Sequence, residues 1–292
     1  MEFPYGTILK EVPPEFVPPE MWPEYGTIAD PHRFCKREYV GDDPQGLRWS
    51  LWPLCLEEYW GDKEPNLEKS RIGDLAYNRI LIWKRISRTD KPKGWFQSSS
   101  SLSRIDGYQF LKEGDFTDTW HKNARRDLRI WQESHLNKTH TIEEITFEEY
   151  KAAYFKSIIA KRVGKDRVYA LEQKYTLPYT RTHTILYGVR NIQTKKIVAG
   201  TAIIFSPTFK SSTHVAPFIH EEGRDIFAAT GLIHHWFLES KRKNIPCVMT
   251  INFWYPGQPK GWKGFSEFKS HFGFQYVAYP PTLYRFARGK IF

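Results

Sequence analysis

Residues 182–206 read THTILYGVRNIQTKKIVAGTAIIFS, and this stretch predicts a β-hairpin. Residues 182–189 and 196–206 are rich in β-branched and aliphatic side chains, whereas residues 191–195 supply a polar turn between them. The second run is apolar over most of its length, which is typical of a strand that is buried on both faces. The hairpin therefore places two neighbouring strands in the middle of a sheet.

The residues after the hairpin alternate between strand and helix patterns. Residues 212–219 are compatible with a third strand, and residues 225–243 carry apolar side chains at helical spacing and end in a basic turn before Pro246. Residues 247–254 read as a buried strand, and residues 276–286 predict the last strand. Alternation of this kind favours a mixed sheet with helices on its faces.

Two helices are expected before the hairpin. Residues 146–162 open with a capping box formed by Thr146 and Glu149. Residues 117–136 place apolar side chains at helical spacing and start near Asp118 or Thr119. The other faces of the helix over residues 117–136 carry basic side chains, which are Lys122, Arg125, Arg126 and Arg129. They form either a solvated surface or a contact for phosphate groups.

The first part of the chain has a different composition. Residues 1–70 are rich in proline and predict an extended arm that lies on the body, anchored by the aromatic stretch RWSLWPLCLEEYW at residues 48–60. Residues 79–86 predict a strand, and residues 89–103 predict an exposed serine-rich loop. We therefore expect an arm over residues 1–70, a middle segment over 71–115 and an α/β (α+β) domain over 116–292.

The charge balance favours an anionic partner. The chain has 43 Lys and Arg against 33 Asp and Glu, so its formal net charge of +10 suits nucleic acid, nucleotide-linked substrates or an acidic surface. No apolar run is long enough for a membrane helix, and the start lacks a signal-peptide pattern. Cys35, Cys55 and Cys247 are scattered, which predicts free thiols, no metal site and a cytoplasmic protein.

The stretch KGFSEFKSHFGF at residues 263–274 predicts a short helix with a glycine stop. Phe265, Phe268 and Phe272 recur at i, i+3 and i+7, so they are expected to share a buried face. Lys269 follows Phe268 by one position and lies at the edge of that face. Its ammonium group could therefore be a surface charge, or it could reach a cleft while its stem lies on apolar surface.

Four stretches resemble the Fem-type peptidoglycan-bridge aminoacyltransferases within the GNAT acyltransferase superfamily, over residues 115–290. They are WHKNARRDLR, KKIVAGTAIIF, GLIHHWFLESKRKNIPCVMTIN and KGFSEFKSHFGF. The resemblance implies a GNAT-like sheet, with residues 71–115 as the remnant of a degenerate first GNAT half. It also implies an N-acyltransferase that moves an aminoacyl or acyl group from an activated carrier, such as aminoacyl-tRNA, to an amine, for example of a peptidoglycan precursor.

The resemblance also implies site residues. Lys269 would stabilise the oxyanion of the transfer reaction, and Phe268 would line the site. Substrate would enter at the end of the buried strand, where Asn252, Trp254 and Tyr255 lie close together in the sequence. His214 and His220 lie near the same place, as substrate contacts or bases, or as ordinary packed histidines. Packing at the strand end is the alternative for Trp254 and Tyr255.

The segment His220–Asp225, HEEGRD, lies where acetyltransferases carry a glycine-rich loop for the pyrophosphate of CoA. The segment has one glycine, and its three acidic side chains repel phosphate. We therefore expect no bound cofactor and a donor other than acetyl-CoA. Arg125, Arg126 and Arg129 would then contact the phosphates of a nucleotide or tRNA. The alternatives are an N-acyltransferase that depends on acyl-CoA or an acyl carrier protein, and a non-catalytic nucleic-acid-binding protein.

Overall fold

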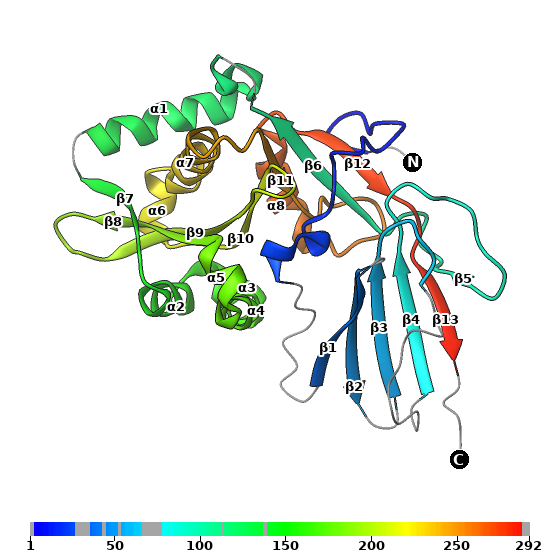
Figure 1. The fold of residues 1–292 in the computed structure, drawn as a ribbon. Coiled ribbons are helices and arrows are strands. Elements are labelled where there is room, and N and C mark those ends of the chain that lie inside the picture. Colours follow the sequence, from blue (N-terminus) through cyan, green and yellow to red (C-terminus); the bar gives the residue numbers. More distant parts are fainter. Residues whose placement is uncertain are drawn as a thin grey trace.

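The computed structural model describes residues 3–26, 36–42, 45–51, 54–65, 78–111, 114–136 and 139–287, with side chains given except for residues 36–54 and 135–136. These residues form two sheets (Figure 1). The seven-stranded sheet has the order β12-β6-β11-β10-β9-β8-β7. Its strands are β6 (Arg104–Phe110), β7 (His140–Glu144), β8 (Thr184–Asn191), β9 (Ile197–Ser206), β10 (Ser211–Ile219), β11 (Cys247–Thr250) and β12 (Gln275–Tyr279).

The six-stranded sheet has the order β1-β2-β3-β4-β13-β5. Its strands are β1 (Lys36–Asp42), β2 (Gln45–Leu51), β3 (Leu54–Trp60), β4 (Asn78–Lys84), β5 (Phe96–Gln97) and β13 (Leu283–Ala287). The α-helices are α1 (Lys122–Leu136), α2 (Phe147–Phe155), α3 (Ile158–Val163), α4 (Asp166–Thr176), α5 (Pro178–Thr182), α6 (Glu221–Asp225), α7 (Ala228–Arg242) and α8 (Lys263–Ser270). Short 3-10 helices are η1 (Pro19–Met21), η2 (Pro23–Tyr25), η3 (Phe116–Thr119) and η4 (Lys260–Trp262).

The predicted hairpin is the centre of the seven-stranded sheet. Strand β8 pairs with β9 in antiparallel register, and β9 pairs with β10 in the same way. Nearly every side chain of β9 is buried, as its apolar sequence predicts. Strand β10 pairs with β11 in parallel, which joins the hairpin to the strands that follow α7.

Helices cover both faces of this sheet (Figure 1). Helices α1 and α7 lie on one face, where Trp236 and Phe237 of α7 are fully buried. The two helices are in close contact, because a Cβ atom added at Gly231 would lie 2.4 Å from the ring of Trp131. Helices α2, α3 and α4 pack on the opposite face. The mixed α/β architecture expected from the sequence is therefore confirmed.

Several predicted element boundaries differ from the structure. The capping box of Thr146 and Glu149 is present, but the helix expected over 146–162 breaks where Ser157 caps a new helix. Helix α7 starts only at Ala228, because Phe227 takes a left-handed backbone conformation with φ of 55°. The first basic helix begins at Lys122 rather than beside Asp118 or Thr119, which form part of η3.

Two strands are exchanged between the sheets. The strand expected over 276–286 is interrupted by the prolines at 280 and 281, so β12 joins the seven-stranded sheet and β13 joins the six-stranded one. Conversely, β6 lies between β11 and β12 rather than beside β4. Proline lacks the N–H that continues a ladder, which explains the switch at this point.

The six-stranded sheet extends into the segment predicted as an arm. Residues 36–42, 45–51 and 54–60 form the paired strands β1, β2 and β3 instead of an irregular arm. Strand β3 pairs with β4 in parallel, as β10 does with β11. The prediction rested on the seven prolines of residues 1–35, whereas residues 36–70 contain three. The division at residues 70 and 115 stays a prediction, and both sheets take strands from more than one of its segments.

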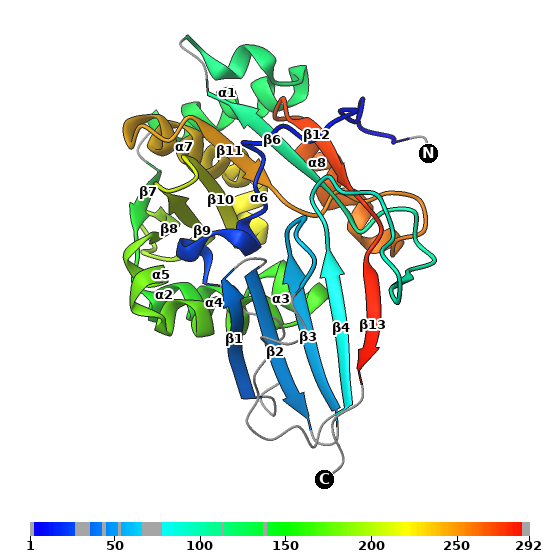
Figure 2. The ribbon, with the colours of Figure 1, turned by 45° about the vertical axis from the view of Figure 1, so that its right-hand side comes forward.

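Residues 3–26 do lie along the body as an irregular arm (Figure 2). Trp22 and Phe16 are fully buried, and the ring of Phe16 stacks on Tyr108 of β6 with centroids 4.1 Å apart. The buried Glu24 carboxylate accepts hydrogen bonds from Ser206 Oγ at 2.8 Å and Thr208 Oγ1 at 2.6 Å. The arm is therefore joined to the seven-stranded sheet by both apolar and polar contacts.

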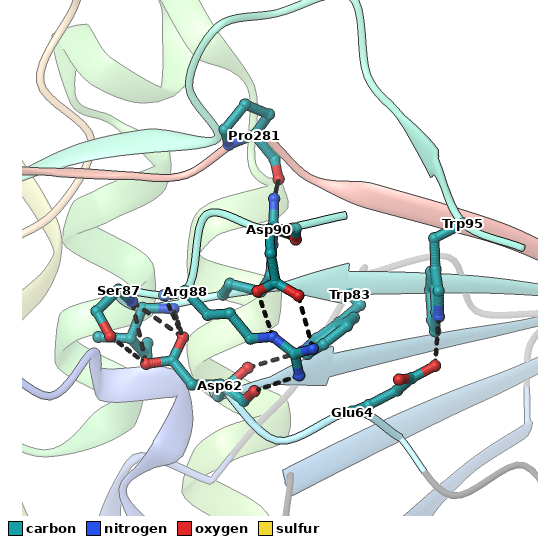
Figure 3. Close-up of polar contacts among 11 residues, drawn as sticks. Asp62, Glu64, Trp83, Ser87, Arg88, Asp90, Trp95 and Pro281 are labelled. Carbon is teal, nitrogen blue, oxygen red and sulfur yellow. Dashed lines mark hydrogen bonds and ion pairs between the residues drawn. The ribbon is translucent and has the colours of Figure 1, made fainter. Parts of the chain in front are cut away.

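A polar cluster fixes the end of β4 beside the crossing between the sheets (Figure 3). The Asp62 carboxylate accepts the successive backbone N–H groups of Ile86, Ser87 and Arg88 at 2.9, 2.9 and 3.0 Å. Arg85 is buried and donates to the carbonyl oxygen of Pro281 at 2.9 Å. These bonds hold the point at which the chain passes from β12 to β13.

None of the helices in the described ranges is long and apolar enough to cross a membrane. Cys55 and Cys247 are buried, whereas Cys35 lies outside the described residues.

Candidate functional site

Lys269 of α8 is half-buried and points at the end of strand β11. Its Nζ atom donates to the backbone oxygens of Ile251 at 2.6 Å and Asn252 at 2.9 Å. The ammonium also lies 4.4 Å from the ring centroid of Phe253. An ammonium group has three N–H bonds, of which two are used here. No described residue accepts the third, which can donate to a substrate oxygen.

The place that Lys269 contacts is where two parallel strands part. Pairing of β10 with β11 ends at Thr213 and Met249, although β10 continues to Ile219. A bulge between Val215 and Phe218, with Ala216 at φ of 47°, turns β10 away at this point. The strand predicted over 247–254 ends early for a related reason, because Asn252 has a φ of 61°.

The surroundings of Lys269 disfavour its positive charge. Burial lowers the pKa of Lys269 to about 7, against the attraction of the Asp106 carboxylate, while Arg167 and Arg104 add to the lowering. A lysine with such a pKa is partly protonated at neutral pH, so it can be a cation or a neutral amine within the physiological range.

A chain of buried ions lies behind Lys269. Asp106 of β6 is fully buried, forms an ion pair with Arg104 at 2.6 Å and accepts the backbone N–H of Asn252 at 2.9 Å. The guanidinium of Arg104 makes two bonds to the Glu20 carboxylate, at 2.6 and 3.1 Å. Burial raises the pKa of Asp106 to about 6, against the attraction of Arg104.

His214 lies on β10 close to the same point. Its Nε2 atom is 3.4 Å from Thr250 Oγ1, and its ring lies against Trp236 with centroids 4.8 Å apart. The Nδ1 atom is buried and has no hydrogen-bond partner among the described residues. Burial lowers the pKa of His214 to about 3, and the charges of Lys269 and Arg167 lower it further, so the ring is neutral.

Arg167 belongs to α4, which covers the face of the seven-stranded sheet opposite to α1 and α7. Its guanidinium lies 5.7 Å from the ring centroid of Phe265, and its charge acts on both Lys269 and His214. Phe265 packs with the α2–α4 side, whereas Phe268 and Phe272 pack with the α1–α7 side. Phe265 therefore contacts a different part of the core from Phe268 and Phe272, because α8 lies between the two parts.

Phe268 lies with its ring against Phe272, at a centroid distance of 5.0 Å, on the core side of α8. Trp254 and Tyr255 are held in the loop that follows β11: Trp254 Nε1 donates to Gln258 O at 3.1 Å, and the Tyr255 hydroxyl donates to Leu102 O at 3.2 Å. His220 lies at the far end of β10, where Nε2 donates to Ala153 O at 2.9 Å. Of the predicted residues, Lys269, Asn252 and His214 are brought together.

The basic side chains of α1 are exposed, including Arg125, Arg126 and Arg129. Arg126 pairs with Asp127 at 2.7 Å. The helix lies on the outside of α7, so these side chains cover an outer surface of the seven-stranded domain (Figure 1).

The segment His220–Asp225 forms α6 and the residue before it. Glu222 accepts from Asn191 Nδ2 at 2.5 Å and lies 3.1 Å from His140 Nε2. The backbone N–H of Arg224 donates to His220 O, and that of Phe227 donates to Arg224 O. The acidic side chains of Glu221, Glu222 and Asp225 lie where a pyrophosphate would need donors.

No cluster of three or more histidine, cysteine or acidic side chains with the arrangement of a metal site occurs in the part of the chain that the structure describes.

Comparison with known proteins supports the fold. No family model matches the chain. The isoleucine–tRNA ligase of Buchnera aphidicola subsp. Cinara cedri is 22% identical over 122 residues, which are 39% of this chain and 13% of the ligase. A crystal structure of FemX superposes with a TM-score of 0.62 over 87% of this chain and 88% of FemX, at 11% identity. The chain has the fold of FemX.

The FemX-like fold recurs in other solved structures. L-PGS from Bacillus licheniformis has a TM-score of 0.52 at 11% identity, covering 86% of this chain and 83% of its own. A conserved protein from Bacteroides thetaiotaomicron has a TM-score of 0.56 at 10% identity, covering 85% and 86%. The resemblance inferred from four sequence stretches is thus confirmed as a GNAT-type fold.

Sequence analysis missed the polar residues that the FemX-like fold brings to Lys269, namely Arg104, Asp106 and Arg167. Arg104 and Asp106 lie two residues apart on β6, so both side chains face the same side of the sheet. The pair of opposite charges at positions i and i+2, Arg104 and Asp106, was the feature of the sequence that could have indicated this buried ion pair. Nothing in the pattern of α4 distinguishes Arg167 from the other exposed basic residues.

Proposed function

We propose that this chain is an N-acyltransferase of the Fem-like kind. It transfers an aminoacyl group from an activated carrier, such as aminoacyl-tRNA, to an amine, for example of a peptidoglycan precursor. The observation that carries the proposal is the Lys269 ammonium, which is held by two backbone carbonyls where β10 and β11 part. This is the position in a GNAT-type fold at which an acyl donor and an amine are expected to meet.

The reaction needs few groups from the protein. The neutral acceptor amine attacks the ester carbonyl of the donor and forms a tetrahedral intermediate whose oxygen is negative. Lys269 donates its remaining N–H to that oxygen, and the charge stabilises the intermediate. When the ester C–O bond breaks, the leaving hydroxyl takes up the proton that the amine loses. His214 is neutral and its Nδ1 has no partner in the described chain, so it provides a contact for substrate at the same place.

Two further features support a donor other than acyl-CoA. The segment His220–Asp225 presents three acidic side chains and one glycine rather than a glycine-rich phosphate loop. The exposed arginines of α1 offer contacts for RNA phosphates, in agreement with the net charge of +10. A tRNA-borne aminoacyl ester fits both features.

The donor can be identified by a transfer assay with the full chain. The assay combines tRNA charged with radioactive amino acids and a UDP-linked peptidoglycan precursor, with and without ribonuclease pretreatment. We expect labelled product that ribonuclease abolishes. Transfer from acetyl-CoA that survives ribonuclease would show a CoA-dependent enzyme instead. Salt-sensitive RNA binding without product in either arm would show a nucleic-acid-binding protein.

The pH dependence should reveal the form of Lys269 that acts. If the ammonium stabilises the oxyanion, its contribution is present below about pH 7 and is lost as the pH rises through the pKa of Lys269. The acceptor amine titrates in the opposite sense, so the ratio of wild-type to Lys269→Arg rates is the quantity to follow. We expect this ratio to fall above pH 7, because arginine keeps its charge. A ratio that rises above pH 7 would instead indicate a neutral lysine acting as a base.

A further inference from the structure

The two carbonyls that hold Lys269 depend on the backbone of Asn252. Successive carbonyl groups of an extended strand point to opposite sides, so a straight strand would offer Lys269 one of the two oxygens. The left-handed conformation of Asn252, with φ of 61°, turns both oxygens to the same ammonium, at 2.6 and 2.9 Å. The position of the cation is therefore coupled to a single unusual backbone conformation.

That conformation is held by strand β6. A residue other than glycine takes a left-handed conformation at a cost in free energy, so its surroundings must supply compensating bonds. The N–H of Asn252 donates to the Asp106 carboxylate at 2.9 Å, and the next N–H, of Phe253, donates to Ile105 O at 2.8 Å. Both acceptors belong to adjacent residues of β6, and the first is a fully buried side chain.

The contacts that hold Asp106 in place extend to the N-terminal arm. Arg104 contacts Asp106 at 2.6 Å and binds Glu20 of η1 with two bonds. Its guanidinium lies 4.7 Å from the ring centroid of Trp60 and 5.4 Å from that of Tyr279, which keeps it in place. A continuous set of contacts thus runs from the arm, through β6, to the end of β11.

We propose that Asp106 is a positioning residue that fixes Asn252, and through it Lys269, and that Glu20 gives the N-terminal arm a part in this support. The inference rests on the proposed role of Lys269 in transfer. The arm then does more than pack on the sheet. The Lys269 ammonium reaches its position only when the arm is docked and Glu20 binds Arg104.

The test does not require a known substrate. The full chain is treated with trace acetic anhydride over a range of pH, and acetylation of Lys269 is quantified by peptide mass spectrometry, which gives the pKa of its amine. The wild type should report a value near 7. The charged or titratable groups that face Lys269 are Asp106 and Arg104 of β6, Arg167 of α4 and His214 of β10, and the variants are chosen with these in view.

Asn252→Val leaves every one of these charges in place but disfavours the left-handed conformation. We expect it to lower the pKa of Lys269 by about one unit, because the ammonium loses a carbonyl acceptor. Asp106→Asn keeps an oxygen for the Asn252 N–H, whereas Asp106→Ala does not, so alanine should lower the pKa further than asparagine. A wild-type pKa in Asn252→Val, or equal shifts in the two Asp106 variants, would overturn the positioning role.

Glu24 provides a matched control for Glu20, since it is a buried carboxylate in the same arm that binds Ser206 and Thr208 instead of Arg104. Glu20→Gln should lower the pKa of Lys269, because Arg104 is less well held and its charge less well compensated. Glu24→Gln should leave that pKa unchanged. Equal shifts in the two variants would mean that the arm acts by packing alone, contrary to the proposal.

Once a donor is found, transfer kinetics add a second readout. Asp106→Asn should lower kcat by about 10- to 100-fold with little change in KM. In a Lys269→Ala background it should have no further effect, because both changes remove the same contribution. If Lys269→Ala keeps full activity, the proposed function is wrong. If the pKa of Lys269 is unchanged in the Asn252 and Asp106 variants, the positioning inference is wrong. The two outcomes are separate.

Discussion

Lys269→Ala is expected to lower kcat for aminoacyl transfer by about 100- to 1,000-fold, the loss that follows removal of one oxyanion donor. The side chain gives its N–H bonds to Ile251 and Asn252 and, in the proposed reaction, to the oxyanion, so its removal leaves the negative oxygen without a cation. KM should change little, because the interaction strengthens in the transition state. Steady-state kinetics with charged tRNA as donor measure both parameters.

Lys263→Ala is the matched control for this change. Lys263 begins the same helix and is exposed, with its Nζ atom 5.7 Å from the ring centroid of Trp254. The control should keep wild-type transfer rates, and circular dichroism should show both variants folded. A folded Lys269→Ala protein with an unchanged kcat would remove Lys269 from the mechanism.

Trp22→Ala should destabilise the protein by about 3–5 kcal/mol, the usual cost of truncating a buried tryptophan. Trp22 has 0% exposure, and its Nε1 atom donates to Val17 O at 2.9 Å. Its indole lies in a core cluster with residues of β6, β9, β11 and β12, so its loss opens a cavity between the arm and the sheet. The free energy of unfolding in urea measures the effect.

Trp262→Ala is the comparison for Trp22→Ala, because Trp262 is 39% exposed in η4. We expect this change to cost about 0.5 kcal/mol or less, as surface substitutions do. If Trp22→Ala lowers stability no more than Trp262→Ala, the arm is not part of the cooperative core and its polar contacts do not contribute to the fold.

The parts of the fold that could be predicted are those with a strong local pattern. The apolar run of β9, the capping box of α2 and the buried face of α7 each indicate their element without any partner. The exchange of β6 and β13 could not be predicted in this way. Strand β6 reads RIDGYQF, and its charged residues are buried only because Glu20 and Asn252, distant in the sequence, meet them there.

The candidate site shows the same limit. Lys269 was selected through the resemblance of the stretch KGFSEFKSHFGF, since its position at the edge of a helix face left a surface charge open. Asn252 was selected because it follows a buried strand. Trp254 and Tyr255 were selected by the same reasoning, yet the loop after β11 turns their polar atoms to Gln258 and Leu102. The left-handed turn at Asn252 decides where each following side chain points, and no sequence period encodes it.

The exchange of strands also determines when the protein can fold during synthesis. Strand β4 ends at Lys84, but its neighbour β13 is made only when the ribosome reaches Leu283. Strand β6 likewise waits for β11 and β12. Both sheets therefore keep an open edge until the last strands emerge, and open edges invite pairing with other chains. Contacts this distant in sequence slow folding, so both sheets can be completed only after residues 283–287 have been translated.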